Sequence, residues 1–121
     1  MIVFEDVTKD YKGGNHALKH VNLRIRKGDF VFVLGHSGAG KSTFIKLILR
    51  EEQVTSGRVL VDGLDLSTMK KRKVPYLRRR MGVVFQDFRL IPTMSVYENV
   101  AFAMRVTNIA EDKIKKRVPY V

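Results

Sequence analysis

The fold is decided by residues 35–42, Gly35-His36-Ser37-Gly38-Ala39-Gly40-Lys41-Ser42. They fit the pattern G-x-x-x-x-G-K-[ST], which is typical of a loop that binds phosphates between a strand and a helix. Residues 30–34, before the loop, are apolar without alternation, as in a strand buried on both faces. Residues 41–51, after it, carry too many apolar side chains for a single stripe, which predicts a mostly buried helix. The flanking sequence therefore supplies the strand and the helix that the pattern requires.

The residue types in this loop match the chemistry of phosphate binding. Glycines let the backbone turn tightly with its N–H groups pointing inward, and the following helix directs its positive end at the same anion. The pattern assigns the Lys41 ammonium to the terminal phosphates and the Ser42 hydroxyl to Mg²⁺. A turn that merely connects strand and helix would explain neither residue. The predicted nucleotide-binding residues are Gly35, His36, Ser37, Gly38, Ala39, Gly40, Lys41, Ser42 and Thr43, with His36 expected to face solvent.

Strands are predicted on both sides of the loop. Residues 2–8 and 21–25 form an antiparallel pair around the turn at residues 13–15, because polar and apolar side chains alternate in the second segment. Residues 59–61 predict a short strand, and residues 81–85 predict another strand buried on both faces. These segments predict an α/β fold, with an antiparallel β layer and the start of a parallel core sheet flanked by helices.

Two helices are predicted further along the chain. Pro75 suits the first turn of a short helix that the cations at residues 78–80 would close. Ser95 and Glu98 have the spacing of a capping box, which predicts a helix from Ser95 to about Arg105.

Hydrolysis of a nucleotide needs more than a phosphate loop. A second acid that holds Mg²⁺ and a group that positions water are also required. Asp62 ends an apolar strand, but the Asp62-Gly63 pair is more typical of a turn. Asp87 follows a strand whose end is occupied by Gln86 rather than by an acid. These residues predict nucleoside triphosphate binding and leave hydrolysis open.

The charge of the chain is concentrated in two places. Lys and Arg number 23 against 12 Asp and Glu, a formal net charge of +11. The excess lies at residues 70–80 and 113–117, and the rest of the chain is balanced. A nucleic-acid patch would combine cations with stacking aromatic side chains, and Tyr76 is the only aromatic residue in the first cluster. We therefore expect no nucleic acid and favour a solvated or partner-facing helix, with attraction to an anionic membrane leaflet as the alternative.

The sequence favours a cytoplasmic location. It contains no cysteine, which excludes disulfides and thiol chemistry and suits a reducing compartment. Its first residues lack the basic and apolar regions of a secretion signal. No stretch approaches the roughly 18 apolar residues of a membrane span. We expect any link to a membrane to come through a partner or a charged surface.

Three features together resemble the nucleotide-binding subunits of ABC transporters: the loop at residues 35–42, the segment Val83-Val84-Phe85-Gln86-Asp87, and the N-terminal strand pair. Within that superfamily, residues 74–90 and Val96-Tyr97-Glu98-Asn99-Val100-Ala101 are similar to the ATPases of bacterial cell division. The resemblance covers essentially the whole chain. It implies a P-loop NTPase of ABC type that binds ATP and Mg²⁺.

The resemblance also implies roles for residues outside the loop. Tyr11 matches the aromatic residue that stacks on adenine. Gln86 matches the glutamine that senses the γ-phosphate through Mg²⁺ and water, so Ser42 and Gln86 are the implied metal-binding residues. Residues 87–95 match the segment that contacts the cytoplasmic helices of a membrane permease, here of the FtsX type. In the family, two subunits form a homodimer on the inner face of the membrane, with ATP between the phosphate loop of one and the signature of the other.

The sequence departs from the family pattern at two points. His36 stands where Pro is common, which a loop position should tolerate. The signature, the acidic strand with the catalytic Glu, and the switch His are not in these 121 residues. We therefore expect residues 1–121 to be the N-terminal part of one nucleotide-binding domain, truncated before the signature and the Walker B strand. Such a chain would bind ATP weakly and would not turn it over, although the parent protein would be an ATPase.

The last predicted helix supports a truncation. It begins near Ala110, and Ile114 and Val118 form its only apolar i, i+4 pair before Pro119 interrupts it. We expect that pair to be too small to anchor the helix.

Two other functions remain open at the level of sequence. An ATPase subunit of a lipoprotein-export or drug-export ABC transporter would share every phosphate-binding motif. A basic interaction module with a vestigial nucleotide site would share the charge. The export ATPase would differ from a cell-division ATPase in the permease that it binds. The basic module would differ from both because nucleotide would not stabilise it.

Overall fold

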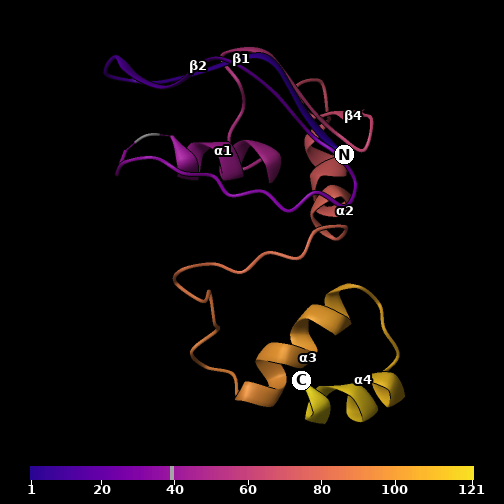
Figure 1. Ribbon diagram of the computed structural model, residues 1–121. Helices are drawn as coiled ribbons and strands as arrows, with labels where there is room; N and C mark the ends of the chain where they lie inside the picture. The colour runs from indigo at the N-terminus through magenta and orange to yellow at the C-terminus, as the bar shows by residue number, and fades with distance from the viewer. Residues whose placement is uncertain (39) are drawn as a thin grey trace. The chain divides into compact units, whose positions relative to one another are not determined.

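The computed structural model describes residues 1–38 and 40–121 (Figure 1). These residues fall into two compact units, Met1–Arg78 and Arg79–Val121. The first unit contains a sheet and the predicted phosphate loop, and the second is helical.

The first unit is built on an antiparallel sheet. Its strands are β1 (Ile2–Tyr11), β2 (Asn15–Ile25), β3 (Ser56–Val61) and β4 (Leu64–Asp65), in the order β2-β1-β3-β4. Phe4 of β1 pairs with Leu23 of β2 on one side and with Val59 of β3 on the other. The predicted antiparallel layer is confirmed, and each of its strands extends beyond the predicted residues.

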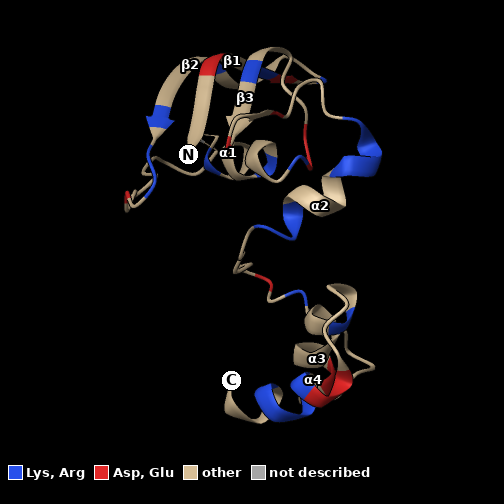
Figure 2. Cartoon of the chain, turned by 90° about the vertical axis from the view of Figure 1, so that its right-hand side faces the viewer, with Lys and Arg blue, Asp and Glu red and all other residues tan. Residues whose placement is uncertain are grey.

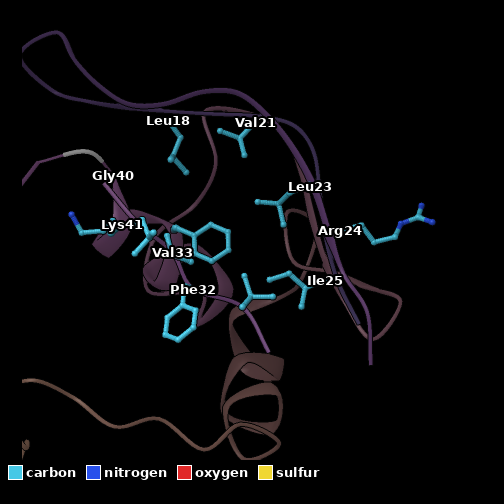
Figure 3. A pocket seen from close by; sticks show the side chains of 12 residues that line it. Leu18, Val21, Leu23, Arg24, Ile25, Phe32, Val33, Gly40 and Lys41 are labelled. Carbon is cyan, nitrogen blue, oxygen red and sulfur yellow. The ribbon is translucent and has the colours of Figure 1, made fainter. Parts of the chain in front are cut away.

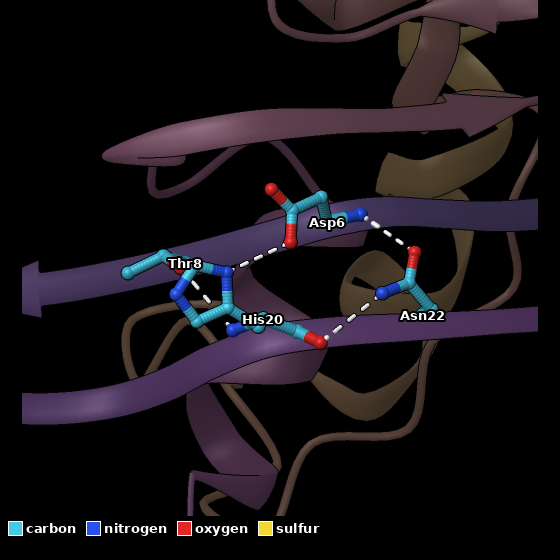
Figure 4. A network of polar contacts seen from close by, with 4 residues as sticks. All are labelled: Asp6, Thr8, His20 and Asn22. Carbon is cyan, nitrogen blue, oxygen red and sulfur yellow. Dashed lines mark hydrogen bonds and ion pairs between the residues drawn. The ribbon is translucent and has the colours of Figure 1, made fainter.

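A polar network stabilises an irregular stretch of the hairpin formed by β1 and β2 (Figure 4). The register shifts on both sides of Val7, and Asp6 and His20 adopt φ angles of 48° and 50°. The Asp6 N–H donates to Asn22 Oδ1 at 2.8 Å, and His20 Nδ1 lies 2.8 Å from Asp6 Oδ1. The His20 N–H donates to Thr8 Oγ1. Side chains therefore satisfy polar groups where the strand ladder is interrupted.

Helix α1 (Lys41–Ile48) packs on the sheet and forms the core with it. The Phe4 and Phe44 rings stack with their centroids 4.7 Å apart. Val7, Leu47 and Val59 are also buried. The helix ends at Ile48 rather than Glu51, because Arg50 takes a φ of 55° and the Glu51 N–H turns back to the Lys46 carbonyl.

The first basic cluster begins with η1 (Lys71–Lys73) and continues into α2 (Val74–Arg78), where Pro75 lies in the first turn as predicted. Leu77 is buried, and the Arg78 guanidinium donates to the carbonyls of Leu49 and Arg50 at 2.9 and 3.3 Å. Arg78 therefore joins α2 to the C-terminal end of α1. Figure 2 shows the cations of η1 and α2 in blue.

Two predicted buried strands are absent from the structure. Residues 30–34 and 81–85 do not pair into any sheet. Phe30, Leu34 and Val84 are 84%, 86% and 98% exposed. A strand buried on both faces needs hydrogen-bonded neighbours and covering layers, and the four strands of the described residues pair only with one another. The prediction of strands at these two segments was wrong for this chain.

The second unit is a pair of packed helices, α3 (Val96–Val106) and α4 (Glu111–Arg117), followed by η2 (Val118–Tyr120). The predicted capping box is confirmed: the Glu98 N–H donates to Ser95 Oγ, and the Ser95 N–H donates to Glu98 Oε2. Ile114 and Val118 are 0% and 6% exposed and pack with Ala101. The expectation that this apolar pair is too small to anchor the last helix was therefore wrong, because α3 offers a small residue that lets the two helices approach.

No helix in the described part of the chain is long and apolar enough to cross a bilayer.

Candidate phosphate-binding site

Lys41 lies inside the predicted phosphate loop. Its Nζ donates to the carbonyl oxygens of Gly35 and His36, each at 2.6 Å. An ammonium group carries three N–H donors, so these two bonds leave one for an anion. The loop thus curls around the cation that the sequence assigned to the terminal phosphates.

Gly40 fixes the place of the loop against the hairpin. Its φ is 84°, and a Cβ built on it would lie 2.2 Å from the Ala17 carbonyl oxygen and 2.9 Å from Leu18 Cδ2. Neither the backbone conformation nor the space permits a side chain. The second glycine of the pattern is therefore required for the approach of β2 as well as for the turn.

The N-terminus of α1 has the polarity of an anion site. Gly40 caps the helix without a side-chain hydrogen bond, and its first turn contains no acidic residue. The first N–H groups of a helix have no partner within the helix, and its dipole is positive at this end. No side chain of the cap competes with an incoming phosphate for these donors.

The other loop residues are placed as expected of a ligand-facing segment. His36, Ser37, Gly38 and Ser42 are exposed. The predicted exposure of His36 is confirmed. Ala39, also predicted to bind nucleotide, lies outside the described residues.

Thr43 connects the loop helix to β1. It is 7% exposed, and its Oγ1 lies 3.3 Å from the Tyr11 hydroxyl. The structure therefore brings Tyr11 next to the first turn of α1, although the two residues are 32 positions apart. The sequence predicts both residues at the site but does not indicate the contact between them.

Lys9 lies beside Tyr11 and pairs with Glu52, and sequence reasoning missed both residues. The Lys9 ammonium is 4.9 Å from the centre of the Tyr11 ring and 2.8 Å from Glu52 Oε2. Lys9 could have been recognised as a neighbour of Tyr11, because residues two apart in a strand share a face. Nothing in the sequence marks Glu52.

An apolar cavity of about 400 Å³ lies beside the loop. Figure 3 shows Leu18, Val21 and Leu23 of β2 pointing toward Phe32 and Val33, with Lys41 at the rim. Because phosphates need N–H donors and cations, this lining does not suit them. The loop itself is the candidate phosphate site.

The predicted Mg²⁺ ligands lie in different units. Ser42 belongs to the first unit and Gln86 to the second, where Gln86 and Asp87 are exposed. No cluster of three or more His, Cys, Asp and Glu side chains suited to a metal ion occurs in the described ranges. The Ser42 hydroxyl fits Mg²⁺, which prefers oxygen ligands and commonly shares them with substrate phosphates.

Known proteins share these features. The ABC transporter family model matches residues 18–118. The cell division ATP-binding protein FtsE of Bacillus subtilis is 51% identical over 98% of this chain and 52% of its own length. FtsE of Escherichia coli is 43% identical over 98% of this chain and 53% of its own length. The methionine import ATP-binding protein MetN of Helicobacter pylori is 44% identical over 98% of this chain and 36% of its own length.

Solved structures agree with the sequence relatives. A dimeric, post-hydrolysis structure of the ATP-binding cassette MJ0796 bound to ADP and Pi matches with a TM-score of 0.88 and 35% identity. The match covers 98% of this chain and 54% of that one. A second match is cbiO1 of Clostridium perfringens, at a TM-score of 0.80 and 34% identity over 96% and 46% of the two chains.

The chain therefore belongs to the ABC transporter family and has the α/β fold of the N-terminal part of an ABC ATPase. Within that family it is similar to the cell division ATP-binding protein FtsE. The chain spans about half the length of the curated relatives it matches. Membership of the family implies nucleotide binding.

Proposed function

We propose that the chain binds ATP and Mg²⁺ at residues 35–43 as part of an ATPase that acts in bacterial cell division. The observation that carries this proposal is the Lys41 ammonium, held by two loop carbonyls at the uncapped N-terminus of α1. The similarity to FtsE supports the role in cell division. No feature of the structure specifically favours an export permease or a basic module.

Residues 1–121 contribute the phosphate-loop side of the ATP site and form the N-terminal part of one nucleotide-binding domain. The chain covers only 52% and 53% of the lengths of two FtsE relatives, which supports this assignment. The signature and the catalytic Glu would come from sequence that these residues do not include. We therefore assign ATP hydrolysis to the whole protein acting as a homodimer.

Tyr11 and Gln86 complete the ligand contacts in this proposal. Tyr11 stacks on adenine, and its position beside Thr43 supports that role. Ser42 supplies a hydroxyl ligand to Mg²⁺, and Gln86 senses the γ-phosphate through the ion and water. When Mg²⁺ is bound, it neutralises charge on the β- and γ-phosphates.

Residues 87–95 form the surface for an FtsX-like membrane permease, which would hold the protein at the inner face of the membrane and receive its conformational changes. Phe88 and Leu90 are 77% and 65% exposed. The Asn99 amide fixes this segment, since it bonds to both the N–H and the carbonyl of Ile91 and to the carbonyl of Met94. Co-purification of the full-length protein tests the partner: recovery of an import or export permease in place of an FtsX-like protein would overturn it.

Replacing Lys41 tests the nucleotide site. Lys41→Ala should weaken ATP binding about 10- to 100-fold, because a hydrogen bond to a charged group contributes about 1.5–3 kcal/mol. Lys46→Ala, which removes a cation on the exposed side of the same helix, is the matched control and should bind as the wild type does. Calorimetric titration with Mg-ATP measures both.

Equal affinity of the wild type and Lys41→Ala would contradict the assignment of the site. Phosphate release measured on the same samples should stay at the background rate. Release that depends on Lys41 would contradict the proposal that this chain carries only one side of the catalytic site.

A further inference from the structure

We propose that Lys9 and Glu52 act as positioning residues that hold the Tyr11 ring for the nucleotide base and so set the preference for a nucleoside triphosphate over a bare triphosphate. This inference rests on the proposed function, because it concerns the base-binding part of the same site. It assigns a role to a partly buried ion pair that the phosphate chemistry does not use.

The pair is partly buried, and its lysine lies over the Tyr11 ring. The Lys9 side chain is 13% exposed and that of Glu52 is 32% exposed, with 2.8 Å between Nζ and Oε2. A lysine so enclosed needs a partner, which Glu52 provides. The ammonium also lies 4.9 Å from the Tyr11 ring centre, within the range of a cation–π interaction.

The position of Glu52 is set by the segment that follows α1. The Thr55 N–H donates to the Thr8 carbonyl at 2.8 Å, and Thr55 Oγ1 accepts from the Asp10 N–H at 2.9 Å. These bonds hold Thr55 beside β1, three residues after Glu52. Glu52 thereby reaches Lys9, which shares a strand face with Tyr11.

Tyr11 is held at two points. The Lys9 cation lies over its ring, and Thr43 of the phosphate-loop helix contacts its hydroxyl at 3.3 Å. With one ring face taken by the cation, a base can stack only on the opposite face. The ring orientation is thus fixed relative to α1, whose N-terminus receives the phosphates. A preorganised ring lowers the ordering cost of base binding.

The experiment compares ATP with inorganic tripolyphosphate, each with Mg²⁺, on the full 121-residue chain. The measured quantity is the ratio of their dissociation constants. Lys9→Met should reduce the preference for ATP about two- to fivefold, which is the range of one cation–π interaction. The loss of the positive charge should weaken the binding of both compounds equally and so leave the ratio unaffected. Lys9→Arg should restore the preference. Lys19→Met, which removes an exposed lysine from β2, is the matched control and should leave the ratio unchanged.

Glu52→Gln separates positioning from simple charge. Removing an acid near the site should strengthen the binding of both anions if charge alone matters. Positioning predicts instead that the preference for ATP falls, as in Lys9→Met, because Lys9 loses its partner.

An unchanged ratio in both Lys9→Met and Glu52→Gln would overturn the inference while leaving the phosphate site intact. Loss of tripolyphosphate binding in Lys41→Ala reports on the proposed function separately. A wild type that binds neither compound would overturn both.

Discussion

Gly40 and Lys41 are adjacent residues with different tasks at the phosphate loop. Lys41 contributes charge and is held by the carbonyls of Gly35 and His36. Gly40 contributes the absence of a side chain, since the Ala17 carbonyl oxygen occupies the space of a Cβ. The pattern of the loop predicted both residues from phosphate chemistry. Only the structure shows that Gly40 also serves the packing of the hairpin, because the approach of β2 is a contact distant in sequence.

A comparison of two glycines tests this packing role. Gly38 and Gly40 have φ angles of 79° and 84°, but a Cβ on Gly38 would meet nothing within 4 Å. Gly38→Ala should therefore cost about 1–2 kcal/mol of unfolding free energy for the left-handed backbone alone. Gly40→Ala should cost about 1–3 kcal/mol more through overpacking. Urea unfolding followed by circular dichroism measures both, and equal losses would show that the Ala17 contact does not matter.

At the scale of elements, the sequence predicted best the features that depend on neighbouring residues. The capping box at Ser95 and Glu98, the helix start at Pro75 and the turn between β1 and β2 each depend on residues a few positions apart. The segments at residues 30–34 and 81–85 were predicted as strands from composition, but strands form only when neighbours pair with them. The contact of Tyr11 with Thr43 and the ion pair of Lys9 with Glu52 were missed for the same reason.

The capping box of α3 also predicts a dependence on pH. The Ser95 backbone N–H and hydroxyl hydrogen-bond the Glu98 carboxylate and hold its pKa below the ordinary 4.5. A carboxyl whose pKa is lower in the folded state stabilises the fold above its unfolded pKa, and this contribution is lost as the pH falls through the folded value. Glu98→Gln should therefore be less stable than the wild type at about pH 7 and should approach it at about pH 3. Thermal unfolding at both values measures the difference, and a gap that does not change with pH would contradict this account of Glu98.

At the scale of the whole molecule, the structure shows where the excess positive charge lies. The net charge of +11 is concentrated at residues 70–80 and 113–117. Arg78 of the first cluster joins α2 to the C-terminal end of α1 through hydrogen bonds. The second cluster lies on α4, which packs against α3. The family and the fold class followed from the phosphate loop, residues 83–87 and the N-terminal strand pair, and the comparisons confirmed them. The roles of Gln86 and of residues 87–95 stay predictions, since they depend on ligands and partners outside this chain.

The most direct test of the central proposal, that ATP binds at the loop before α1, is amide hydrogen exchange with and without Mg-ATP. We predict slower exchange at residues 35–43 and at Tyr11, by about tenfold when ATP is about ten times its Kd. Lys41→Ala should abolish this protection. Protection confined to the basic residues 70–80, or none at the loop, would contradict the account.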